Sequence, residues 1–168
     1  MAEGLRWRRA GDQRGDSAGS GRRSVLVVAD TSGLLAAFDR DSPDSSACEE
    51  VLREAGTVVV SPMVLTELDH LTRRRFGGPQ RVVVMNFVFS QVDRMRFLVP
   101  DTGRDVLGVA REVQQRYAGL DLDLADAVNV ALAAEFRTTD ILTLDRRDFR
   151  AIRPLVAAEA FRLLPDDR

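Results

Sequence analysis

The sequence is poor in residues on which many catalytic sites depend: it has no lysine, one cysteine and one histidine in 168 residues. Without lysine, the protein cannot form a Schiff base or bind phosphate through a P-loop. Because Cys48 is the only cysteine, the chain has no internal disulfide and no cysteine metal cluster. Because His70 is the only histidine, a zinc site built from several histidines is excluded as well. No apolar run approaches the roughly 18 residues of a membrane-spanning helix, so we expect a cytoplasmic protein without a membrane segment.

Neither sign of charge is in large excess, because 24 arginines stand against 26 acidic residues and the formal net charge is −2. Any surface that binds nucleic acid must therefore be local. Residues 1–23 carry several of the arginines among glycine, serine and aspartate, without sustained periodicity. This composition predicts a disordered basic tail, with an arm that binds RNA as the alternative. Residues 24–168 are then long enough for one domain with a core.

Short valine-rich apolar runs alternate with helical patterns along the rest of the chain. We expect strands at about 25–29, 57–60, 97–99, 140–145 and 161–165. Helical spacing predicts helices at about 33–38, 44–55, 62–75, 102–117 and 124–136. Residues 81–92 are ambiguous, since their valines favour a strand and their spacing favours a helix. This alternation predicts an α/β fold with a parallel sheet of about five strands, covered on both faces.

Four acidic residues stand at positions that such a fold can bring together. Asp30 and Asp145 each follow an apolar strand, and carboxyl ends of parallel strands meet at the edge where α/β sheets bind ligands. Asp126 lies in the first turn of the 124–136 helix, and Glu67 lies beside the apolar stripe of the 62–75 helix. Each has a simpler explanation, because Asp30, Asp126 and Asp145 could serve only as helix-start or capping residues and Glu67 could be solvated. Asp148 lies close to Asp145.

Four converging carboxylates would have to share protons or bind a hard cation. Mg²⁺ and Mn²⁺ prefer oxygen ligands, and such acids hold them near phosphates. A cation held there can polarise a phosphoryl oxygen and lower the pKa of a bound water. The predicted reaction is hydrolysis of a phosphodiester by metal-activated water.

Four motifs carry a family resemblance: Val27-Val28-Ala29-Asp30-Thr31-Ser32, Ser61-Pro62-Met63-Val64-Leu65-Thr66-Glu67-Leu68-Asp69, Leu124-Ala125-Asp126-Ala127 and Leu142-Thr143-Leu144-Asp145-Arg146-Arg147-Asp148-Phe149. With these motifs in this order, the chain resembles a PIN domain of the VapC type, the ribonuclease toxin of bacterial toxin–antitoxin pairs. The resemblance implies a three-layer α/β/α fold and a helix over residues 81–92.

The resemblance also implies particular site residues and partners. Asp30, Glu67, Asp126 and Asp145 would be the catalytic quartet that holds Mg²⁺ or Mn²⁺, and Thr143 would be a nearby supporting hydroxyl. The expected partners are a VapB-type antitoxin that covers the acidic cleft, an RNA substrate, and a second copy of the chain contacting through the helices at 62–92.

The RNA backbone needs basic contacts, and two arginine groups are candidates: Arg73, Arg74 and Arg75 with Arg81, and Arg146 and Arg147 with Arg150. Aromatic residues make up only 6% of the chain, so base stacking contributes little and the shape of a structured RNA is the better expectation. Transfer, ribosomal and messenger RNA all remain open. The alternative function is a catalytically silent PIN-like module that binds RNA or protein. A phosphatase with Asp30 as nucleophile is disfavoured, because Ser32 stands where a second aspartate is needed.

Overall fold

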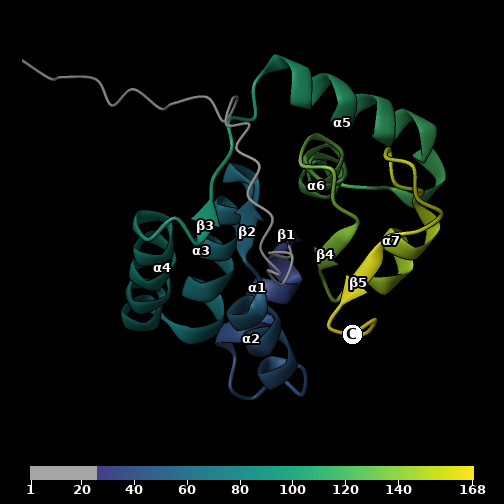
Figure 1. Ribbon diagram of the computed structural model, residues 1–168. Helices are drawn as coiled ribbons and strands as arrows, with labels where there is room; N and C mark the ends of the chain where they lie inside the picture. The colour runs from purple at the N-terminus through teal and green to yellow at the C-terminus, as the bar shows by residue number, and fades with distance from the viewer. Residues whose placement is uncertain (1–25) are drawn as a thin grey trace, which may run out of the picture.

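The computed structural model describes residues 26–168, which form a five-stranded parallel sheet between two layers of helices (Figure 1). The sheet order is β3-β2-β1-β4-β5, with β1 at the centre. Its strands are β1 (Leu26–Ala29), β2 (Thr57–Val60), β3 (Phe97–Leu98), β4 (Asp140–Leu142) and β5 (Arg162–Leu164). The predicted basic tail, residues 1–23, lies outside the described residues.

The register places the carboxyl ends of the central strands at one edge. Ala29, the last residue of β1, lies opposite Val60 of β2 and Leu142 of β4. The chain continues from these ends into Asp30, Ser61 and Thr143. The acid that follows β1 is therefore flanked by the segments that follow both of its neighbours.

Seven α-helices cover the sheet within residues 26–168. They are α1 (Thr31–Phe38), α2 (Ser45–Glu54), α3 (Pro62–Phe76), α4 (Gly78–Asp93), α5 (Arg104–Arg116), α6 (Leu124–Glu135) and α7 (Arg146–Ala151), and a short 3-10 turn, η1 (Ala118–Leu120), precedes α6. Strand side chains alternate between two cores: Val27 and Ala29 pack with α1 to α4, whereas Val28 packs with α5 to α7. The predicted α/β fold class, with a five-stranded parallel sheet in three layers, is confirmed.

Residues 81–92 are helical, as the family resemblance implies, despite the strand preference of Val82, Val83 and Val84. Pro79 stands in the first turn of α4, where its missing N–H is not needed. Val84 and Val88 then face the core from successive turns. Tertiary packing thus overrides the local propensity of three consecutive valines.

The predicted strand at 140–145 is too long, because β4 ends at Leu142. The Thr143 N–H still donates to the Leu164 carbonyl, 3.0 Å away, but the chain then turns into α7. The alternating Leu142-Thr143-Leu144 pattern therefore imitates a strand beyond the point where pairing stops. Asp145 is the N-cap of α7 and not the last residue of a strand.

The helices of residues 26–168 include none that is long and apolar enough to cross a membrane.

Candidate active site

Asp30 sits at the end of the central strand, nearly buried, with 6% of its surface exposed. One carboxylate oxygen, Oδ2, accepts hydrogen bonds from the hydroxyls of Ser32, at 2.6 Å, and Thr143, at 2.9 Å. The other, Oδ1, accepts one from the side-chain amide of Asn129 at 3.4 Å. Asp30 also caps α1, with the Ser32 N–H donating to it. Asp30 can therefore cap α1 and still be part of a functional site.

Glu67 lies in the second turn of α3, and its carboxylate is tied to α1. Ser61 caps α3 by accepting the Val64 N–H, and Pro62 is the first helical residue, so the beginning of this helix is fixed. The Thr31 hydroxyl donates to Glu67 Oε2 over 2.6 Å. Because Thr31 directly follows Asp30, this bond holds the two acids on the same side of the sheet edge.

Asp126 lies in the first turn of α6, as the sequence predicts. Its backbone N–H donates to Asp123, the N-cap of α6, over 2.9 Å. Burial, and after it the charges of nearby acids, together raise the pKa of the Asp126 carboxyl from 3.8 to about 8; these acids are Asp30, Asp123, Asp145 and Asp148. Asp126 is thus protonated over much of the neutral range when no cation is present.

Asp145 and Asp148 complete a close group of acids with Asp126. The three residues each bring a carboxylate oxygen to a point where all three oxygens lie within 4.8 Å of one another. Asp145 Oδ1 accepts the Asp148 N–H at 3.2 Å, which holds the first turn of α7. Asp148 lies outside the predicted quartet, although its helical spacing of three from Asp145 is a signal that places it on the same side of α7.

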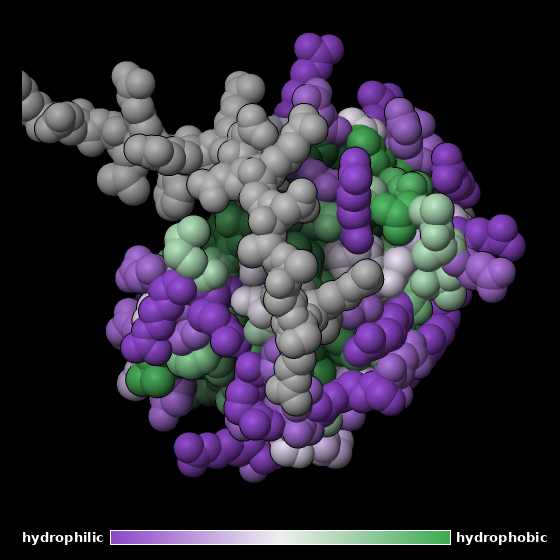
Figure 2. All heavy atoms as spheres, in the orientation of Figure 1, coloured by the Kyte–Doolittle hydropathy of each residue, from purple (hydrophilic) through white to green (hydrophobic). Residues whose placement is uncertain are grey.

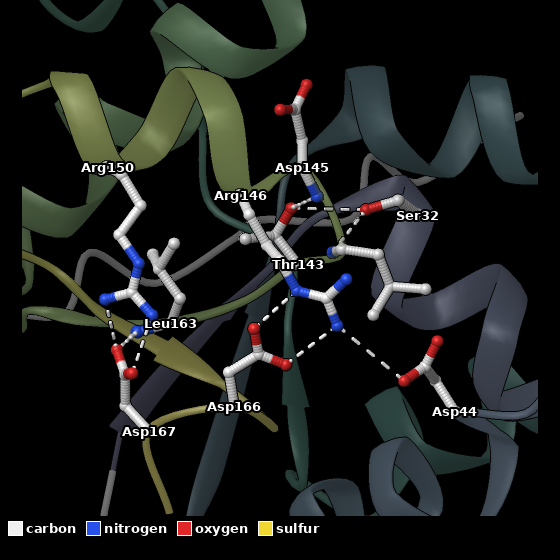
Figure 3. A network of polar contacts seen from close by, with 10 residues as sticks. Ser32, Asp44, Thr143, Asp145, Arg146, Arg150, Leu163, Asp166 and Asp167 are labelled. Atoms are coloured by element: carbon white, nitrogen blue, oxygen red, sulfur yellow. Dashed lines mark hydrogen bonds and ion pairs between the residues drawn. The ribbon is translucent and has the colours of Figure 1, made fainter.

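Thr143 lies beneath this group and joins its parts. Its hydroxyl donates to Asp30 and accepts the N–H of Asp145 at 3.0 Å. The Ser32 hydroxyl lies 3.2 Å from that of Thr143 and accepts the Leu144 N–H at 2.9 Å. Figure 3 shows Ser32, Thr143 and Asp145 linked in this way beside Arg146. These contacts fix the β4–α7 segment to the end of β1.

All four predicted acids line one open cleft of about 610 Å³. The same cleft is lined by Asp123 and His70, while Thr143 is 1% exposed and lies behind its wall. The donors are mainly carboxylate oxygens, which suit Mg²⁺ or Mn²⁺ rather than a metal that prefers sulfur or several imidazoles. The neighbouring acids make ionisation of the Asp126 carboxyl unfavourable. A divalent cation bound among them would offset this repulsion. The residues present therefore fit such a cation.

Most of the arginines expected to contact RNA are engaged in ion pairs. Arg146 pairs with Asp166 and Asp44, and Arg150 with Asp167, as Figure 3 shows. The remaining pairs are Arg75 with Asp39, Arg81 with Asp69 and Arg147 with Asp148. Arg73 and Arg74 are exposed and have no ion pair within residues 26–168. Exposed pairs are weak, so phosphates can still compete for these arginines.

Comparison with known proteins gives matches in sequence and in structure. The PIN domain family model matches residues 27–154. Ribonuclease VapC26 of Mycobacterium tuberculosis is 37% identical over 130 residues, which span 77% of this chain and 93% of that protein.

Two solved structures share the fold. One is M. tuberculosis VapC20, described as a sarcin-ricin loop cleaving toxin, with a TM-score of 0.64 and 20% identity over 72% of this chain and 91% of that one. The other is VapBC2 from Rickettsia felis bound to a promoter DNA fragment, with a TM-score of 0.59 and 17% identity over 79% of this chain and 96% of that one. These two structures agree in fold, and the sequence matches show that the chain belongs to the PIN-domain family and, within it, to the VapC-type ribonucleases.

Proposed function

We propose that this VapC-type toxin cleaves RNA with the help of a divalent cation, Mg²⁺ or Mn²⁺, bound in its acidic cleft. The observation that carries the proposal is the convergence of Asp30, Glu67, Asp126 and Asp145 on one cleft. These acids come from four separate segments, so shared capping chemistry does not explain their meeting. Asp148 is added to the cation-binding set, because its carboxylate lies with those of Asp126 and Asp145.

Each part of the site has a role in phosphodiester hydrolysis. A bound cation would supply Lewis-acid chemistry, activating water for attack and stabilising charge on the phosphoryl group. The cleft acids would hold that cation, with Asp126 as a deprotonated carboxylate. Thr143 and Ser32 orient the Asp30 carboxylate through their hydroxyls, and Thr31 orients Glu67.

The test is cleavage of RNA by purified wild-type protein, Asp30→Asn and Asp126→Asn, with Mg²⁺, with Mn²⁺ and with chelator. Asparagine keeps the shape of aspartate and removes its charge, so each variant should lose at least 100-fold in rate while its circular dichroism is unchanged. Asp93→Asn, at the exposed end of α4, is the matched control and should cleave normally. Equal activity in wild type and both site variants, or cleavage without a cation, would contradict the proposal.

A folded, metal-supplied wild type that binds RNA without cutting it would favour the alternative, a catalytically silent PIN-like binding module. Retention of all four predicted acids in one cleft argues against that module. Growth arrest that persists in the Asp126→Asn variant would argue for it.

The proposed substrate is a structured RNA, gripped at its phosphates by arginines beside the cleft. Arg74 lies seven residues after Glu67, which places it on the same face of α3, two turns further along. His70 and Leu71, between them, line the cleft. Arg73 and Arg75 flank that face, and Arg146 and Arg147 directly follow Asp145, which lines the cleft, at the beginning of α7. Mapping the new ends in total bacterial RNA would show whether cuts fall in transfer, ribosomal or messenger RNA.

The proposed partner is a VapB-type antitoxin whose basic residues cover the acidic cleft. A second hollow of about 660 Å³ between α1, α2 and α4 offers apolar contact to the same partner through Phe38, Leu52, Val83 and Phe87. Co-expression with the antitoxin should abolish cleavage, and Phe87→Asp should weaken the complex without lowering the activity of the free enzyme.

We also propose a homodimer through α3 and α4. Val82 and Phe89, seven residues apart on one face of α4, are 49% and 53% exposed, and Figure 2 shows hydrophobic side chains among hydrophilic ones over this part of the molecule. Phe89→Asp should convert a dimer to a monomer in light scattering, whereas Met95→Asp, beyond the end of α4, should not.

A further inference from the structure

Asn129 is a buried amide in an otherwise apolar part of α6. None of its surface is exposed, and its neighbours Val128 and Val130 are equally buried. Its amide N–H donates to Asp30 Oδ1, a contact between residues 99 positions apart. Its carbonyl oxygen has no hydrogen-bond partner within residues 26–168. A buried acceptor left unpaired costs folding free energy, so an apolar residue of similar size would suit this position better if only stability mattered.

The contact complements those made by the two hydroxyls. Ser32 and Thr143 both donate to Asp30 Oδ2, which fixes one oxygen of the carboxylate. Rotation about the last bond of an aspartate side chain is otherwise soft. Among the described residues, Asn129 is the one side chain that donates to Oδ1. It therefore determines which way the second oxygen and its free lone pair face.

Asn129 also links two acids of the cleft. It lies three residues after Asp126, on the same side of α6, and α6 packs against β1. The amide thus connects the helix that carries Asp126 to the acid at the end of the central strand. Displacement of either element would change the separation and orientation of both carboxylates.

We propose that Asn129 is a positioning residue of the ribonuclease, which orients Asp30 relative to Asp126 and so sets the affinity of the cleft for a divalent cation. This inference rests on the proposed function. Hydrogen bonds that orient the ligands of a metal are each worth about 10–100-fold in metal affinity or activity. Asn129 acts through Asp30 and has no contact with the substrate of its own.

The experiment measures the affinity of the full chain for Mn²⁺ alone, by electron paramagnetic resonance, together with the Tm of the metal-free protein. Asn129→Leu removes the amide and keeps a side chain of the same branched shape, although it is larger, and Asn129→Ala removes the amide without risk of overpacking. Both should bind Mn²⁺ about tenfold more weakly, and Asn129→Leu should keep or raise the Tm. Val130→Ala, one residue along in the same buried helix, should lower the Tm by several degrees and leave Mn²⁺ affinity unchanged.

The outcomes separate this inference from the proposed function. If both Asn129 variants bind Mn²⁺ like wild type while the wild type cleaves RNA, Asn129 only fills the core and the inference is wrong. Weakening of equal size in Val130→Ala would overturn it as well, because affinity would then follow stability. A wild type that neither binds Mn²⁺ nor cuts RNA would overturn both.

Discussion

Asp126 should make the stability of the metal-free protein depend on pH. Its pKa is raised from 3.8 to about 8 by burial and by neighbouring acids. Between these values the folded chain keeps a proton that the unfolded chain has lost, so the free energy of unfolding falls as pH rises and levels off above about pH 8. Asp126→Asn has no such proton. With chelator present, its Tm should exceed that of wild type by several degrees at pH 8 and approach it near pH 4, and a gap independent of pH would contradict this.

The proton on the Asp126 carboxyl should be released into solution when the cation binds. Ligating carboxylates must be deprotonated, so binding of a metal near neutral pH releases protons. Titration calorimetry of Mn²⁺ at pH 6.5, in buffers of different ionisation enthalpy, should show release of about one proton from wild type. At pH 9, above the raised pKa of Asp126, release should vanish. Release that is equal at both pH values would assign the proton to another group.

At the scale of elements, α1 must approach β4 closely for the site to form. A side chain on Gly33 would meet the Leu142 carbonyl oxygen at 2.7 Å, and this neighbour is backbone that cannot rotate away. Gly33→Ala should therefore cost about 1–3 kcal/mol of stability, and it should also lower activity because Ser32 is pushed away from the Leu144 N–H. Chemical denaturation measures the first effect and RNA cleavage the second.

The matched control is Gly108→Ala on α5, where an added methyl group meets nothing within 4 Å. It should stabilise the protein by about 0.5–1 kcal/mol, since alanine is the better helix former. If Gly33→Ala were stabilising to the same degree, the close packing of α1 on β4 would not limit this position.

The elements themselves follow largely from local pattern, whereas several contacts of the site do not. Apolar runs and helical spacing locate β1, β2 and α6, and the rule that parallel strand ends meet at one edge brings Asp30 and Asp145 together. The pattern fails after Leu142, where alternation continues and pairing stops. The pattern also does not predict a role for Asn129, because the contact between its amide and Asp30 exists only once β1 and α6 pack together.

At the scale of the whole molecule, a net charge of −2 leaves RNA binding to a few well-placed arginines. Arg74 is the strongest candidate, because it is exposed, without an ion pair within residues 26–168, and aligned with Glu67 along α3. Arg94 is also exposed but precedes β3, at the edge of the sheet opposite the cleft. Arg74→Ala should weaken RNA binding and reduce the slope of log affinity against log salt by about one.

That slope decides between a phosphate contact and a structural role. Binding by Asp126→Asn, which is expected not to cut, can be measured at several salt concentrations, with Arg74→Ala or Arg94→Ala added. Each phosphate contact contributes its own released counterion, so loss of Arg74 should change the slope and loss of Arg94 should not. A drop in affinity with an unchanged slope would mean that Arg74 supports the fold of α3 and does not contact RNA. Equal slopes together with equal affinities in all three proteins would instead favour an RNA path over the arginines at the beginning of α7.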